Sequence, residues 1–150
     1  WILQSSPIDE KTIMRGKIDF HFYLNVIPAF LLSFCGSILL GLGLLDIALI
    51  TIYTVAFTYL ISSFGMMMGT MRVNLNWTNP VIPIKQSMAV MITLFGGWVV
   101  AIVYPLSWYL MRSFMPSVVW KILMTLLIVI FDVVCYRWCV TKGAKIIKEL

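Results

Sequence analysis

Charged side chains are scarce in this sequence of 150 residues. Asp, Glu, Lys and Arg together make up 11% of it, whereas hydrophobic residues make up 61%. The mean hydropathy is +0.99. This composition lies outside the range of soluble globular domains, because a core of this size does not absorb so much apolar surface. A water-soluble fold is therefore excluded.

Residues that bind metals or carry out acid–base chemistry are also few. The chain has one histidine, His21, and three cysteines, Cys35, Cys135 and Cys139, which fall inside apolar stretches and are not expected to form disulfides. Cys135 and Cys139 share the i, i+4 spacing of metal ligands, but His21 is predicted on another helix, and isolated cysteines are commonly small buried apolar residues. We expect no metal or cofactor in this chain. No Ser–His, Asp–Asp or His–Glu pair recurs at helical spacing, so we expect no enzymatic activity.

Long apolar stretches fill most of the chain, at about residues 20–45, 47–71, 88–109 and 118–140. Each reaches the roughly 20 residues that a helix needs to cross the hydrocarbon core, and only helices or closed barrels satisfy their backbone in lipid. The alternating pattern of a barrel is absent. The sequence therefore predicts an all-α membrane protein, a bundle of about four transmembrane helices in a lipid bilayer.

The basic residues lie beside the spans and predict their orientation. Nine fall on one side of the predicted bundle, whereas two, Arg112 and Lys121, fall on the other. Such an excess marks the cytoplasmic side, so we expect both termini and the loop 72–87 in the cytoplasm of a multi-pass cell-membrane protein. The net charge of +5 is a topology signal, and no nucleic-acid partner is expected. The nine are Lys11, Arg15, Lys17, Arg72, Lys85, Arg137, Lys142, Lys145 and Lys148.

The segments outside the spans differ in character. Residues 1–19 predict a short cytoplasmic helix that either anchors the chain to the membrane or docks a partner, and residues 141–150 predict a basic cytoplasmic tail. The sequence begins at Trp1 without an initiator Met or a signal peptide, so we expect it to be a piece of a longer polypeptide. In the helix, Ser6 is the expected cap, Pro7 the first position, Asp9 and Glu10 the acidic first turn, and Arg15 and Lys17 the basic last turn.

Two polar residues are predicted inside the spans. Asp132 lies in the fourth stretch and Asn25 in the first. An ionisable group within a span costs a few kcal/mol or more unless it is partnered. Asp132 is either a substrate or proton site, or a structural carboxylate that pairs with Arg137 or with a cation on a helix outside this sequence; we favour the structural role. For Asn25 we favour a hydrogen bond between helices.

Small residues and prolines predict how the helices pack. Two rows of small residues at every fourth position predict close helix–helix contacts, more often within one protein than in a dimer. Pro28 and Pro105 predict kinks in the first and third helices. The rows are Ser33, Ser37 and Gly41 on the first helix and Gly65 and Gly69 on the second.

The segments flanking the first two spans carry two short patterns. Before the first span stand Trp1, then Ser5 to Ile8 and Gly16-Lys17. The loop 72–87 has the pattern Leu-x-Trp-x-Asn followed by Lys-Gln, at Leu75, Trp77, Asn79, Lys85 and Gln86. Both patterns resemble those of the permease subunits of bacterial ABC-2-like exporters. The loop departs from the family pattern at Gly69, Val73 and Pro80, and the resemblance covers the C-terminal part of such a permease.

The resemblance implies a mechanism divided between chains. This sequence has no G-x-x-x-x-G-K-[ST] motif to cradle ATP phosphates. ATP with Mg²⁺ is therefore expected on a separate ABC ATPase subunit, with a second permease half or a homodimer completing the machine. The expected export substrate is a peptide, a lipid-like molecule or a drug-like molecule. The expected contacts with the ATPase are Pro7, Asp9, Glu10, Lys11, Arg15 and Lys17.

Two other classes of function remain open. A membrane module that anchors or assembles a partner without transport would associate with no ATPase. An ion-coupled secondary transporter would need ionisable groups within the spans, for which Asp132 is the one candidate.

Overall fold

The computed structural model describes residues 9–71 and 88–149, and this part of the chain is an all-α bundle without strands. Four helices are long and apolar enough to cross a membrane. The predicted fold class, a four-helix membrane bundle, is confirmed. The helices are α1 (Glu10–Leu39), α2 (Leu44–Met71), α4 (Met88–Met111) and α5 (Ser117–Trp138), and α5 continues through a π-helical turn, η1 (Cys139–Gly143), into α6 (Ala144–Glu149).

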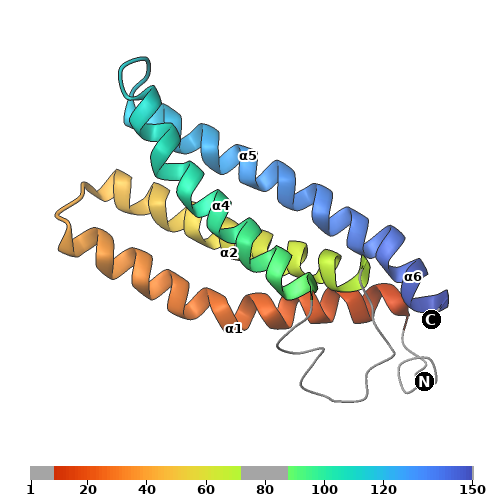
Figure 1. The fold of residues 1–150 in the computed structure, drawn as a ribbon. Coiled ribbons are helices and arrows are strands. Elements are labelled where there is room, and N and C mark those ends of the chain that lie inside the picture. Colours follow the sequence, from red (N-terminus) through yellow and green to blue (C-terminus); the bar gives the residue numbers. More distant parts are fainter. Residues whose placement is uncertain (1–8, 72–87, 150) are drawn as a thin grey trace.

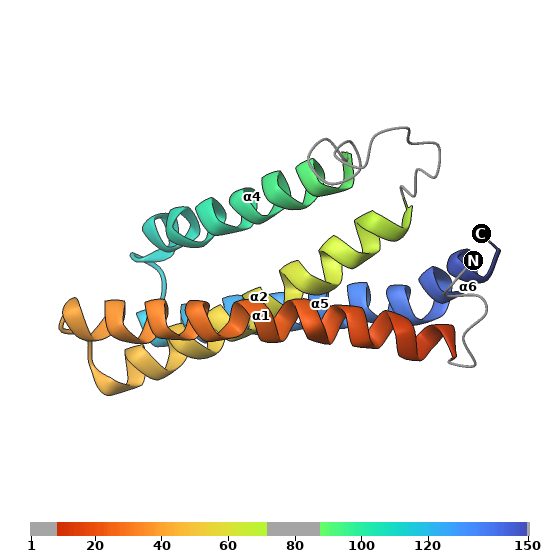
Figure 2. The ribbon, with the colours of Figure 1, turned by 90° about the horizontal axis from the view of Figure 1, so that it is seen from below.

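α2 is the central helix of the bundle. It packs against α1 on one side and α5 on the other, whereas α4 contacts mainly α2 (Figure 1). Seen from below, α4 stands apart from α1 along its length and approaches α5 near the turn that joins them (Figure 2). We call the end with the α1–α2 and α4–α5 connections the turn end. α1 begins and α6 ends at the opposite end, the terminal end (Figure 1).

The first helix differs from the prediction at both ends. α1 is continuous from Glu10 to Leu39, so the predicted helix before residue 20 and the predicted span from residue 20 belong to one helix. Its N-cap is Asp9, which makes no side-chain capping hydrogen bond. The change from charged to apolar residues near residue 20 suggested two segments, but the backbone is helical across it. The predicted cap Ser6 and first position Pro7 lie outside the described residues.

The first turn comes earlier than the sequence predicted. Gly41 has a φ of 67°, a left-handed conformation that glycine adopts without steric cost. Its N–H donates to the Ile38 carbonyl and the Leu42 N–H donates to the Ser37 carbonyl, the paired bonds of a Schellman motif. The apolar stretches 20–45 and 47–71 predict the connection at residue 46, because the leucines before it keep the segment apolar. The structure places it at residues 40–43.

The terminal end is held by packing between α1 and the C-terminal segment. Met14 and Ile18 on α1 are fully buried with Cys139 and Ala144. Gly143 faces α1 so closely that an added Cβ would lie 2.7 Å from Met14 Cε. The residues predicted as a basic tail are helical as far as Glu149, within η1 and α6.

α4 approaches α2 through glycines of both helices. A Cβ on Gly65 would lie 3.3 Å from Thr93 Cγ2, and one on Gly96 would lie 3.1 Å from Phe64 Cε1. Gly65 was predicted to act in this way, whereas Gly69 faces open space. Gly41 belongs to the turn and not to a packing row. Pro28 lies within α1 and Pro105 lies within α4, and each helix continues past its proline.

The outer surface of the bundle is apolar. Large hydrophobic side chains are more than half exposed on every spanning helix, including Leu32 on α1, Trp98 on α4 and Ile130 on α5. In water such a surface would aggregate, whereas in hydrocarbon it matches the solvent. The exposed apolar side chains and the lengths of the helices together indicate a multi-pass membrane protein.

Candidate functional site

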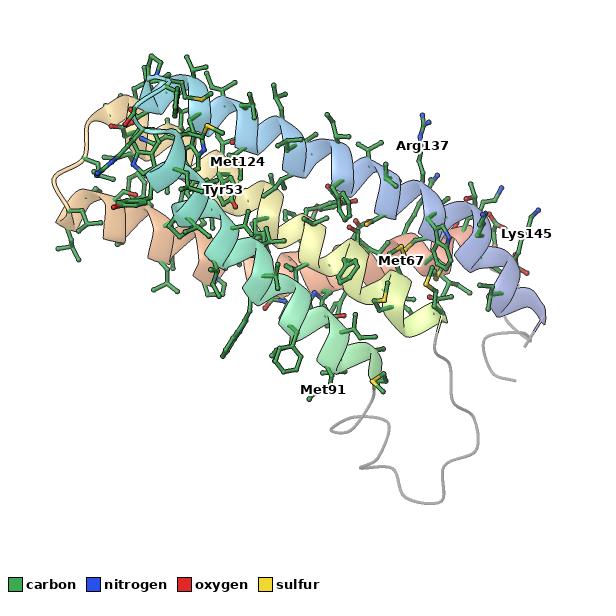
Figure 3. The ribbon with its side chains drawn as sticks, turned by 45° about the horizontal axis from the view of Figure 1, so that its top comes forward. Tyr53, Met67, Met91, Met124, Arg137 and Lys145 are labelled. Carbon is green, nitrogen blue, oxygen red and sulfur yellow. The ribbon has the colours of Figure 1, made fainter. Side chains whose placement is uncertain are left out.

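The carboxyl group of Asp132 reaches across from α5 to the central helix. Its Oδ1 lies 2.8 Å from Oγ of Ser63, a side chain with no exposed surface. Ser63 Oγ also lies 3.1 Å from the Leu60 carbonyl oxygen, and Cys139 Sγ lies 3.5 Å from the Ser63 carbonyl oxygen. Among the described residues Asp132 has no ion-pair partner. Of the two structural pairings considered for Asp132, the one with Arg137 is not present in the described chain, and Figure 3 shows Arg137 directed away from the bundle.

His21 makes the corresponding contact from the other side of α2. Its Nδ1 lies 3.0 Å from Oγ of Ser62, the residue next to Ser63, and Ser62 donates to the Thr58 carbonyl at 2.9 Å. Asn25 donates to the His21 backbone carbonyl at 2.8 Å, within its own helix. Among the described residues, the side chain of Asn25 contacts only its own helix, and His21 contacts the neighbouring helix instead.

An ion pair joins α2 and α5 at the turn end. Lys121 Nζ contacts Asp46 Oδ1, and both side chains are partly buried. Asp46 lies in the first turn of α2, where the helix dipole favours an anion. Lys121 lies five residues into α5, close to a helix N-terminus that disfavours a cation, so Asp46 compensates for this position.

Aromatic side chains from α2, α4 and α5 pack beneath this ion pair. Tyr53 and Tyr104 have ring centroids 4.0 Å apart, Tyr104 and Trp120 have theirs 4.5 Å apart, and Trp108 and Trp120 have theirs 5.4 Å apart. The hydroxyl groups of Tyr53 and Tyr104 are buried without a hydrogen-bond partner among the described residues. Figure 3 shows Tyr53 between the helices at this end, near Met124. At the turn end, an ion pair and contacts between aromatic rings therefore join α2, α4 and α5.

Basic side chains gather at the terminal end. On α1, Lys11, Arg15 and Lys17 are exposed, on the same turns whose Met14 and Ile18 are buried. Arg137 and Lys145 extend from the outer face of α5 and α6 (Figure 3). Arg112 and Lys121 lie at the turn end, so the basic residues of the described chain separate between the two ends as the sequence predicted.

Several predicted site residues lie outside the described residues. These are Pro7 and the family-like loop residues Leu75, Trp77, Asn79, Lys85 and Gln86. Of the other predicted contacts, Asp9 caps α1 and Glu10 lies in its first turn. Within residues 9–71 and 88–149, no group of three or more His, Cys, Asp or Glu side chains is placed to hold a metal ion, and Cys135 and Cys139 are buried free thiols.

The sequence analysis missed Ser62, Ser63 and the Asp46–Lys121 pair. Serines are common in apolar helices, and the one signal for these two was that they stand next to each other in an apolar stretch. Asp46 stands between the first two predicted spans and Lys121 near the start of the fourth, so no local pattern in the sequence paired them. Comparison of the chain with protein-family models, with characterised proteins and with solved structures found no match.

Proposed function

We propose that this chain is the membrane-spanning permease part of an ATP-driven exporter whose ATPase is a separate subunit. One observation carries the proposal: α1 is a single helix of 30 residues that begins in a charged turn and extends through the bundle. Such a helix is about 45 Å long. Because it is continuous, a displacement of its charged end by a partner is passed along its length.

The packing of the terminal end supports the same proposal. Met14, Ile18 and Gly143 fix the first turns of α1 to η1 and α6, whereas the exposed face of the same turns carries Lys11 and Arg15. A partner that binds the exposed face therefore acts on α1 and α5 together. ATP binding to that partner would supply the differential binding energy that shifts the bundle between two states.

Charge and surface support the location and the substrate class. The excess of basic residues at the terminal end favours a cytoplasmic position for it in the cell membrane. The apolar faces of the helices favour export of a peptide, a lipid-like molecule or a drug-like molecule, and a second permease half or a second copy of the chain would complete the path.

The test is purification of the intact protein from its native host in mild detergent, followed by mass spectrometry of the associated chains. We expect a stoichiometric protein with a G-x-x-x-x-G-K-[ST] motif. Absence of any nucleotide-binding protein in several detergents would overturn the proposal and leave a membrane module that anchors a partner as the first alternative.

A charge exchange tests the docking surface itself. Glu10→Lys combined with Arg15→Glu preserves the net charge, and therefore the topology signal, but reverses the pattern that a partner reads. We expect loss of the ATPase from the purified complex without loss of the folded chain. Arg112→Gln, at the exposed turn end, is the matched control and should retain the ATPase.

An ion-coupled secondary transporter is the second candidate. The contact of Asp132 with Ser63 is the observation that favours it, because an acidic side chain inside a span is costly unless it is partnered or functional. Transport driven by an ion gradient in vesicles that contain the chain without any ATPase would establish this alternative.

A further inference from the structure

The number of protons at Ser63 points to the chemical state of Asp132. Ser63 Oγ lies within hydrogen-bonding distance of two oxygen atoms, Asp132 Oδ1 at 2.8 Å and the Leu60 carbonyl at 3.1 Å. A serine hydroxyl has one proton and donates one hydrogen bond. With an ionised Asp132, the single serine proton is divided between the two oxygen atoms in a three-centre bond or is given to one of them alone. With a protonated Asp132, the acid O–H donates to Ser63 Oγ and the serine O–H donates to Leu60, so both contacts are hydrogen bonds.

The surroundings of Asp132 in the described chain contain no cation. The neighbouring titratable groups are neutral or acidic, α4 carries no charged residue, and Arg137 points outward (Figure 3). An ionised carboxylate at the centre of a spanning helix costs about 2.5–3.5 kcal/mol on insertion scales. A neutral acid removes this charge. The neighbouring groups are Tyr59 on α2, Cys135 and Tyr136 on α5, Cys139 on η1 and, on the far side of Tyr59, Asp19 on α1.

The neighbouring serine also contacts a titratable side chain of another helix. Ser62 Oγ lies 2.9 Å from the Thr58 carbonyl oxygen and 3.0 Å from His21 Nδ1, and this nitrogen lies 3.5 Å from the Asn25 amide nitrogen. Consecutive residues of α2 therefore contact one titratable side chain on α1 and one on α5. Because His21 is exposed, it marks the side of this arrangement that is open to the surroundings of the bundle.

We propose that Asp132 and Ser63 form a reversible proton-binding site inside the bundle. Uptake of a proton forms an O–H bond on Asp132 and removes one negative charge, and the Ser63 proton turns from Asp132 to the Leu60 carbonyl. Release of the proton reverses both changes. His21, which contacts Ser62, is the second titratable group beside the site. This site does not depend on the proposed ATPase, because its ligand is a proton.

The first experiment uses an apolar carbodiimide on the full chain in lipid nanodiscs. The reagent adds to a protonated carboxylic acid: the carboxyl oxygen bonds to the central carbon, the acid proton moves to nitrogen, and the adduct rearranges to a stable acylurea. Peptide mass spectrometry locates it. We expect modification of Asp132 at neutral pH and a decrease of about tenfold for each pH unit above the midpoint. Asp132→Asn should abolish it, and Asp46, held by Lys121, should remain unmodified.

Infrared spectroscopy provides a second measurement that does not depend on access of a reagent. The difference between the wild-type chain and Asp132→Asn should contain the carbonyl stretch of a protonated acid at neutral pH, replaced by carboxylate bands in alkaline buffer. Carboxylate bands alone at neutral pH would overturn the proposal. Both measurements are made on the chain without an ATPase, so their failure is distinguishable from failure of the proposed permease function.

Discussion

Asp46 and Asp132 are both carboxylates of spanning helices, yet the bundle treats them differently. Asp46 lies at the turn end, in the first turn of α2, and pairs with Lys121. Asp132 lies inside α5 and contacts the neutral side chain of Ser63. A cation and a helix N-terminus stabilise the carboxylate of Asp46, whereas Asp132 has a single hydroxyl group as its partner. The difference separates a structural ion pair from a site that can gain or lose a proton.

Among the variants that test this difference, removal of Lys121 should have the largest effect on stability. Lys121→Met leaves Asp46 without its cation, and we expect the free energy of unfolding to fall by about 2–4 kcal/mol, near the range for breaking a buried pair. Unfolding by sodium dodecyl sulfate in mixed micelles measures it. The double variant with Asp46→Asn should recover most of the loss, and additive losses in the double-mutant cycle would contradict the coupling.

Ser63→Ala should have a smaller effect. The change removes the hydrogen-bond partner of Asp132 and leaves its polar atoms unsatisfied, so we expect a loss of about 1–2 kcal/mol in the same unfolding assay. Ser33→Ala is the matched control, because Ser33 contacts only a carbonyl of its own helix in the described chain. Equal losses for the two variants would show that the contact between α2 and α5 does not contribute to the free energy of unfolding.

Asp132→Asn should change stability less than Ser63→Ala. The amide has nearly the shape of the protonated acid and donates to Ser63 in the same way, so we expect a change below about 1 kcal/mol. Asp46→Asn, in contrast, leaves Lys121 unpaired and should cost more. If the two asparagine variants lose equal stability, the distinction between the two carboxylates is wrong.

Tyr104→Phe should have the smallest effect and the opposite sign. The buried Tyr104 hydroxyl has no partner among the described residues, so its removal should leave stability unchanged or raise it by up to about 1 kcal/mol. Thermal unfolding in nanodiscs measures the change. A clear loss of stability would show that the hydroxyl is hydrogen-bonded in the membrane, and Tyr109→Phe, on the exposed face of α4, serves as the control.

The sequence identified the four spans because length and hydropathy suffice in lipid, but it misplaced the ends where apolar character continues across a boundary. The Gly41 turn and the continuity of α1 from Glu10 are examples. The left-handed conformation of Gly41 sets the turn, the unbroken backbone of α1 joins two predicted segments, and hydropathy reports neither.

By itself, the sequence determined the membrane class, the helical content and the separation of basic residues between the two ends, since these follow from composition and spacing. Only the tertiary structure decided that α2 is central, that Lys121 faces Asp46, and that neighbouring serines hold His21 and Asp132. These pairs join residues 41 to 75 positions apart. No local pattern encodes them, because the packing of whole helices sets which polar groups meet.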